Sequence, residues 1–222
     1  MVAWPCPGPG GVTDELAIAF DASRAARLLI VPPLFEEMNR TRRMLVETMR
    51  RLDRLGIDSF LPDLPGCNES TQRFEAQSLY SWRAAMAQAA KHFGATHALA
   101  MRGGALVFPV ALPGWVLEPV KGATILRQMV RARTIAAREA GWSEDSAELL
   151  EAGRTEGLEL AGYHVGAAMI AGLESARPED EGQREIRQSD LGGGALWLRS
   201  EPGESAEQAD ALARLIADGI DA

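Results

Sequence analysis

The feature that most constrains the fold is a short apolar run at residues 27–31 (RLLIV), which stops at Pro32 and Pro33. Because its apolar residues do not alternate with polar ones, the run predicts a strand buried on both faces, as in a parallel sheet. An amphipathic helix is predicted soon after it, at about residues 37–55, and Gly56 provides the C-terminal stop. A buried strand followed by a helix is the first part of a βαβ unit.

The same alternation continues along the chain. Further strands are predicted at residues 15–20, 57–61, 97–101, 115–117 and 195–199, and further helices at 79–93, 122–140, 143–150 and 205–220. Strands that alternate with helices in this way imply right-handed crossovers, which predicts an α/β fold with a mainly parallel sheet and helices on both faces. At 222 residues the chain is expected to form a single domain, residues 1–222.

Three segments are expected to lie outside this core. Residues 1–13 are rich in proline and glycine and are predicted to be irregular. The helices within residues 121–174 are expected to form a lid over the edge of the sheet. Residues 175–193 are polar and glycine-rich, which predicts a flexible linker.

Composition argues against several classes of function. The net charge of −8 disfavours nucleic acid as a partner, because phosphate repels an acidic surface. The two cysteines make neither a disulfide framework nor a zinc site, and no motif indicates a metal or another cofactor. No apolar window reaches the roughly 18 residues of a membrane span, and the N-terminus lacks the pattern of a secretory signal, so we expect a cytoplasmic protein.

Three segments, in this order, match what an α/β-hydrolase places around its active site. Residues 31–35 (VPPLF) would end a strand and turn, so that Leu34 and Phe35 offer backbone N–H groups to an oxyanion. Residues 63–70 (DLPGCNES) look like the loop D-x-x-G-x-G-x-S that follows the next strand. Residues 100–104 (AMRGG) fall where strand meets helix in the G-x-S-x-G elbow.

A longer stretch is more specific. Residues 32–43 (PPLFEEMNRTRR) resemble the P-P-F-x-E-E-M-N-x-x-R-R signature of the exosortase A system-associated hydrolases, bacterial proteins linked with exopolysaccharide and surface-sorting loci. Residues 115–120 (WVLEPV) and 159–163 (ELAGY) resemble the second type of that system's hydrolases. The resemblance covers about residues 15–175 and implies a shortened α/β-hydrolase-like fold with hydrolase ancestry.

The chemistry of the elbow position does not fit a working hydrolase. Arg102 stands where the nucleophilic serine would be, and a guanidinium stays protonated and has no nucleophilic lone pair. Gly103 still offers an N–H group. Hydrolase chain order places the triad histidine after the acid, near the C-terminus, yet the last histidine here is His164. The sequence therefore contains no Ser-His-Asp triad, and we predict a hydrolase-like protein that is degenerate in catalysis.

Two alternatives stay open from the sequence. The first is an active hydrolase or acyltransferase on an ester or thioester, with Cys67 or Ser70 as nucleophile and His164 as base. The second is a scaffold that forms a homodimer through surfaces that contain tryptophan. Whether the chain is an enzyme is left undecided between these hypotheses.

Arg102 itself has two interpretations. If its side chain points into the protein, the loss of hydration requires a partner, and the candidates are Glu36, Glu37 and Glu118. The simpler interpretation is a structural salt bridge that fills an inactive site. The other is that Arg102 binds an anionic small molecule through its carboxylate or phosphate group.

Overall fold

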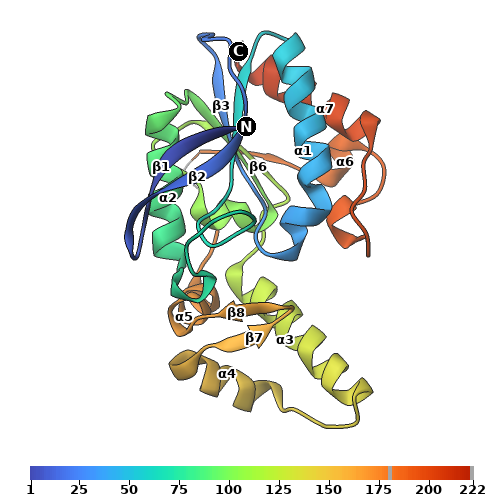
Figure 1. Ribbon diagram of the computed structural model, residues 1–222. Helices are drawn as coiled ribbons and strands as arrows, with labels where there is room; N and C mark the ends of the chain where they lie inside the picture. Colours follow the sequence, from blue (N-terminus) through green and yellow to red (C-terminus); the bar gives the residue numbers. More distant parts are fainter. Residues whose placement is uncertain (180–181, 221–222) are drawn as a thin grey trace.

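The computed structural model describes residues 1–179 and 182–220, and its centre is a seven-stranded sheet with helices on both faces (Figure 1). The strands β3 (Arg27–Val31), β4 (Asp58–Pro62), β5 (His97–Met101), β6 (Gly114–Leu117) and β9 (Arg184–Ile186) are parallel. The antiparallel hairpin of β1 (Val2–Gly8) and β2 (Gly11–Phe20) joins them at β4. The order β1-β2-β4-β3-β5-β6-β9 is that of a mainly parallel sheet, which confirms the α/β prediction.

The apolar run that ends at Pro32 forms the inner strand β3. Leu28, Leu29, Ile30 and Val31 have 0% exposure. Successive side chains of a strand point to opposite faces of its sheet. Leu29 and Val31 accordingly belong to one hydrophobic cluster and Leu28 and Ile30 to another. The lack of alternation in the sequence thus reflects a strand that has protein on both sides.

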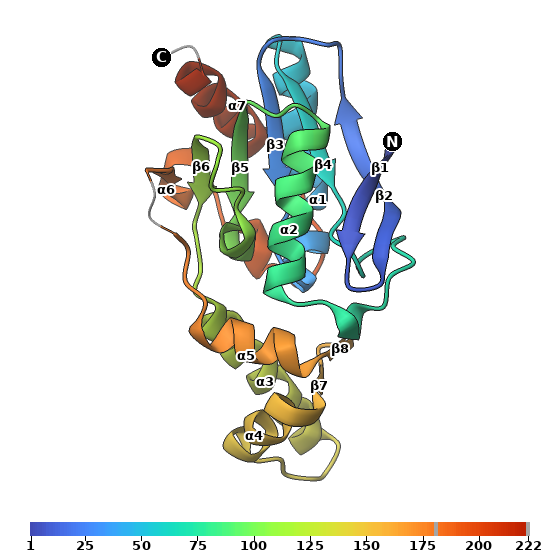
Figure 2. The ribbon, with the colours of Figure 1, turned by 90° about the vertical axis from the view of Figure 1, so that its left-hand side faces the viewer.

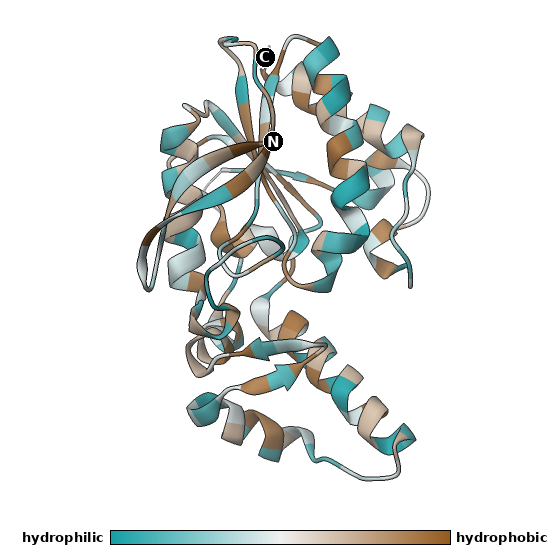
Figure 3. Ribbon diagram, in the orientation of Figure 1, coloured by the Kyte–Doolittle hydropathy of each residue, from teal (hydrophilic) through white to brown (hydrophobic). Residues whose placement is uncertain are grey.

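Different helices cover the two faces of the sheet. On one face α1 (Glu36–Arg54) and α7 (Ala206–Ile220) pack against each other. On the other face lies α2 (Leu79–His92), which stands in front of the strands in Figure 2 and begins with a capping box of Ser78 and Ser81. In Figure 3 hydrophilic and apolar residues alternate along α1, as expected for a helix with one buried face.

A separate layer lies beyond the carboxyl ends of the parallel strands, at the bottom of Figures 1 and 2. It consists of α3 (Gly122–Glu139), α4 (Ser146–Glu156), the hairpin of β7 (Leu158–Leu160) and β8 (Tyr163–Val165), and α5 (Ala167–Ser175). Its two ends meet, because the N–H of Gly122 donates to the carbonyl of Ala176 at 3.0 Å. We call this layer, residues 121–176, the lid layer.

Several local predictions were wrong. The segment predicted to be irregular, residues 1–13, pairs in β1 and β2. The predicted linker, residues 175–193, contains β9 and the short helix α6 (Gln188–Leu191), while its residues 180–181 lie outside the described residues. The strand predicted at 195–199 is instead the 3-10 turn η3 (Leu196–Leu198). β9 was missed because only Ile186 among its three residues is buried, so it has little apolar signal.

A buried carboxylate holds the amino-terminal end of the sheet. Asp58, the first residue of β4, has 0% exposure and accepts hydrogen bonds from the backbone N–H groups of Ala22 at 3.0 Å and Arg24 at 2.8 Å. The guanidinium groups of Arg24 and Arg27 also donate to it, at 3.0 and 2.8 Å. Three donors from the segment before β3 and one from the first residue of β3 therefore converge on one carboxylate, which attaches this part of the chain to β4.

We predict that Asp58→Ala lowers the free energy of unfolding by about 3–5 kcal/mol, because it leaves buried donors without an acceptor. Urea unfolding followed by circular dichroism measures this loss. Asp53→Ala is the matched control, because Asp53 also pairs with Arg24 but its side chain is 41% exposed, and we expect a cost of at most about 1 kcal/mol. Equal costs for the two variants would contradict this assignment.

Candidate functional site

The chain turns sharply where β5 ends, as an elbow requires. Arg102 follows the strand with a φ of 54°, a backbone region that residues other than glycine adopt only under constraint. A Cβ on Gly104 would come within 2.5 Å of the carbonyl oxygen of Pro32, so the corner lies directly against the end of β3 and requires glycine there. The six-residue 3-10 segment η2 (Arg102–Val107) follows, where a hydrolase would have a long helix.

The side chain at this corner contacts protein groups from three parts of the chain. Arg102 is 12% exposed and forms an ion pair with Glu37, which is 18% exposed, through Nη2 at 3.1 Å and Nε at 3.2 Å. Its Nη1 donates to the carbonyl oxygen of Glu118 at 3.1 Å. The ring of Trp197 lies over the guanidinium, with 4.8 Å between the ring centroid and Cζ. These contacts compensate for the hydration that a buried cation loses.

Of the three predicted partners of Arg102, only Glu37 uses its carboxylate. Glu36 pairs with Arg40 at 2.6 Å instead. The carboxylate of Glu118 accepts the backbone N–H of Gln188 at 2.7 Å, and Glu118 meets Arg102 only through its backbone.

Sequence reasoning missed Trp197, which was assigned to a strand. One signal was available in the sequence. In hydrolases the segment after the last strand returns to the elbow, where it places the histidine of the triad. In this chain η3 follows β9 and places the indole ring of Trp197 against the side chain at the corner. An aromatic face is an attractive surface for a guanidinium but supplies no base.

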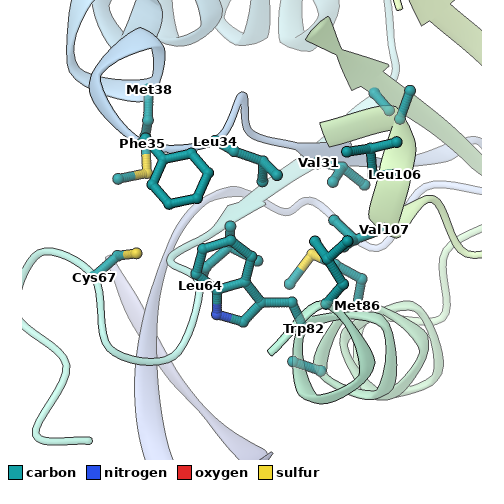
Figure 4. Close-up of a cluster of buried hydrophobic side chains, with 14 of the residues drawn as sticks. Val31, Leu34, Phe35, Met38, Leu64, Cys67, Trp82, Met86, Leu106 and Val107 are labelled. Atoms are coloured by element: carbon teal, nitrogen blue, oxygen red, sulfur yellow. The ribbon is translucent and has the colours of Figure 1, made fainter. Parts of the chain in front are cut away.

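Apolar side chains fill the space beside the corner. Leu34 and Phe35, expected to form the oxyanion turn, are 2% and 3% exposed. Phe35 precedes α1 with φ 57° and ψ −137°, and its ring points into the buried cluster in Figure 4. A Cβ on Gly103 would lie 2.7 Å from Ile125 and 3.0 Å from Leu34, so both side chains touch this glycine. The position expected to donate an N–H is therefore closely covered.

A cleft of about 310 Å³ lies above these residues, between the start of α1, helix α3 and η3. Glu36, Glu37 and Arg40 line its α1 side. Ile125 and Met129 form much of its apolar wall on α3. Arg102 lies beneath this lining rather than in it, since Glu37 and Trp197 face the cleft in its place.

The structure places Cys67 and Ser70 in the loop after β4, where, among the described residues, no histidine forms a hydrogen bond with either of them. Cys67 is buried at the edge of the cluster around Phe35 (Figure 4), and burial, followed by the charges of Asp63 and Glu15, raises the pKa of its thiol to about 12. The hydroxyl of Ser70 donates to Glu15 at 2.7 Å and accepts the N–H of Gly66 at 2.8 Å. Ser70 thus stabilises its own turn.

The remaining candidate, His164, lies in the hairpin of the lid layer. It is exposed and pairs with Glu159 in the β7–β8 register. Its neighbour Tyr163 packs against Phe35 and Phe74 at 5.7 and 5.0 Å between ring centroids. Because successive strand residues point in opposite directions, His164 faces away from the side on which Tyr163 meets Phe35.

No group of three or more histidine, cysteine or acidic side chains in ranges 1–179 and 182–220 is placed to hold a metal ion. Within the same ranges, none of the helices is both long enough and apolar enough to cross a bilayer.

The comparisons with known proteins support the fold. No protein-family model and no curated protein sequence matches the chain. Among solved structures, an esterase from Thermogutta terrifontis with malate bound superimposes with a TM-score of 0.59 at 14% identity, covering 100% of this chain and 98% of that one. Est1E from Butyrivibrio proteoclasticus with ferulic acid bound gives 0.57 at 12% identity, covering 93% and 94%.

A third solved structure is similar over almost the same extent. The mouse alpha/beta hydrolase domain-containing protein 10 gives a TM-score of 0.55 at 12% identity, covering 94% of both chains. At these identities the likeness establishes an α/β-hydrolase-like fold for this chain, as the elbow geometry also indicates.

We predict that Arg102 and Glu37 are energetically coupled. A double-mutant cycle with Arg102→Ala and Glu37→Gln, measured by urea unfolding, should give a coupling energy of about 1–3 kcal/mol, because each single change leaves a part-buried charge without its partner. The matched cycle uses Arg43 and Glu204, an ion pair whose side chains are 66% and 48% exposed. That pair should give at most about 1 kcal/mol, and similar values for both cycles would contradict the prediction.

The buried thiols should be unreactive in the folded protein. Desolvation raises the pKa of both Cys6 and Cys67 to about 12, so at pH 8 only about one thiol in 10,000 is a thiolate, the reactive form. Alkylation by iodoacetamide at pH 8 should therefore be slow until denaturant is added. Modification of Cys67 in the native protein as fast as in the unfolded chain would show that the loop after β4 opens readily.

Proposed function

We propose that this protein is a hydrolase-fold protein that binds a ligand in its cleft and does not hydrolyse it. The observation that carries the proposal is the state of the elbow side chain. Arg102 occupies the position of the nucleophile, and Glu37, the carbonyl of Glu118 and the ring of Trp197 take up its guanidinium. Such a side chain neither attacks a carbonyl nor accepts a proton.

The arrangement of charges favours an uncharged ligand. Glu36 is paired with Arg40, and Glu37 with Arg102, so the charged side of the cleft is neutralised within the protein. The opposite wall is mostly apolar, with Ile125 and Met129, and Gln128 is its uncharged polar residue. We therefore propose a ligand with an apolar portion that packs on α3 and a few neutral hydrogen-bonding groups that face α1. A carboxylate or phosphate would first have to displace Glu37 from Arg102.

The biological setting comes from the sequence motif alone. The resemblance of residues 32–43 to the exosortase A system-associated signature supports a role in a bacterial exopolysaccharide system, and we propose that the protein acts there in the cytoplasm. Deletion of the gene should change the amount or length of surface polysaccharide. Complementation by Arg102→Ser, which restores only a hydroxyl at the elbow, would be no better than complementation by the natural chain.

The absence of hydrolysis is directly testable. We predict that short-chain p-nitrophenyl esters and thioesters are turned over at the background rate by the natural chain and equally by Arg102→Ala, Cys67→Ala and His164→Ala. The reason is that the described residues that line the cleft include no serine, cysteine or histidine. Activity that falls in the Cys67→Ala or His164→Ala variant would establish the alternative, an active hydrolase or acyltransferase.

Thermal-shift measurements with carboxylates and phosphates distinguish the two roles of Arg102. We expect no stabilisation of the natural chain by either class, because Glu37 already occupies the guanidinium. A rise in Tm that depends on Arg102 but persists in Arg40→Ala would instead support the anionic ligand.

The homodimer is a separate proposal, tested by light scattering over a range of concentration. Four of the five tryptophans are at most 5% exposed, which leaves Trp142 as the tryptophan available to an interface.

A further inference from the structure

The lid layer has a cationic face on its longest helix. Arg127, Arg131 and Arg138 lie four and seven residues apart on α3, and all three are exposed. At 3.6 residues per turn these intervals place them within about 40° of one another around the helix axis. The opposite side of the helix, with Leu126 and Met129, is buried in the protein.

These three arginines differ from the others of the lid layer. Arg133 pairs with Glu144, and Arg154 pairs with Glu174. Arg127 donates only to its own helix, at the carbonyl of Ala123 and the hydroxyl of Thr124. Within ranges 1–179 and 182–220 no ion pair involves Arg127, Arg131 or Arg138. A chain with a net charge of −8 thus gathers unpaired cations on one exposed face.

An apolar side chain is exposed on the same face. Ile135, 45% exposed, follows Arg131 by four residues and precedes Arg138 by three, so it lies close to both on the helix surface. Arginines beside an exposed aliphatic side chain suit a helix face that rests on an anionic lipid surface.

Nearby carboxylates cancel little of the positive charge on this face. Glu144 is engaged by Arg133, and the carboxylate of Asp145 caps α4 by accepting the N–H of Ala147 at 2.8 Å. The acidic residue of α3 itself is Glu139, and it lies roughly 100° around the helix from the arginines.

We propose that this α3 face, formed by Arg127, Arg131, Ile135 and Arg138, binds the surface of an anionic lipid bilayer. The guanidinium groups contact lipid phosphates, and Ile135 sits at the level of the headgroups. The attachment is peripheral and electrostatic, and it does not depend on whether the cleft hydrolyses a substrate.

Vesicle co-sedimentation tests the proposal. The full chain should bind vesicles of phosphatidylcholine mixed with phosphatidylglycerol and not vesicles of phosphatidylcholine alone. Binding should disappear near 1 M salt, where the Debye length falls to about 3 Å. Replacing all three arginines by glutamine should weaken binding by roughly 100-fold, since each cation near an anionic surface contributes about a factor of five. Thermal melts of the variants verify that they remain folded.

A matched variant makes the test specific. Arg50→Gln, Arg54→Gln and Arg214→Gln together remove the same charge from exposed positions on α1 and α7, and this variant should bind as the natural chain does. Equal loss in the two triple variants would overturn the proposal, as would equal binding to neutral vesicles or binding that survives high salt. Stronger competition by a soluble acidic peptide than by anionic vesicles would also overturn it, in favour of a protein partner.

Discussion

The site depends on one requirement: a permanent cation at a buried corner needs partner groups that compensate for its lost hydration. The corner is fixed by β5 and by the contact of Gly104 with the end of β3, so the side chain of Arg102 has little choice of position. Its partners come from three distant parts of the chain: the first turn of α1, the end of β6 and the segment after β9. One guanidinium therefore ties together the elements that, in an enzyme of this fold, would supply the oxyanion turn, the acid and the base.

Much of this arrangement could be predicted from the sequence, because its signals are local. The unbroken apolar run of β3 and the glycines after Arg102 report directly on burial and on a tight turn. The three histidines of the chain and the arginine at position 102 are equally visible in the sequence. Since a buried cation needs an anion, Glu37 was among the partners expected for Arg102.

Other features were not predictable, because tertiary contacts create them. β1 forms despite its prolines, since it lies at the edge of the sheet, where a missing N–H costs little. β9 consists of two exposed charged residues and Ile186, and only its pairing with β6 makes it a strand. Conversely, Leu196 and Trp197 resemble a strand in sequence but bury their side chains as a 3-10 turn. The contact of Trp197 with Arg102 spans 95 positions of the chain.

The closure between Gly122 and Ala176 brings the two ends of the lid layer to one point of the fold. A segment that leaves a sheet and returns to the same point behaves as an insertion, whose exchange leaves the path of the remaining chain unchanged. Residues 121–176 can thus diverge, lengthen or be swapped between relatives while the strands on either side keep their register. Sequence change within these residues can alter the α3 wall of the cleft while the walls on α1 and η3 stay as they are.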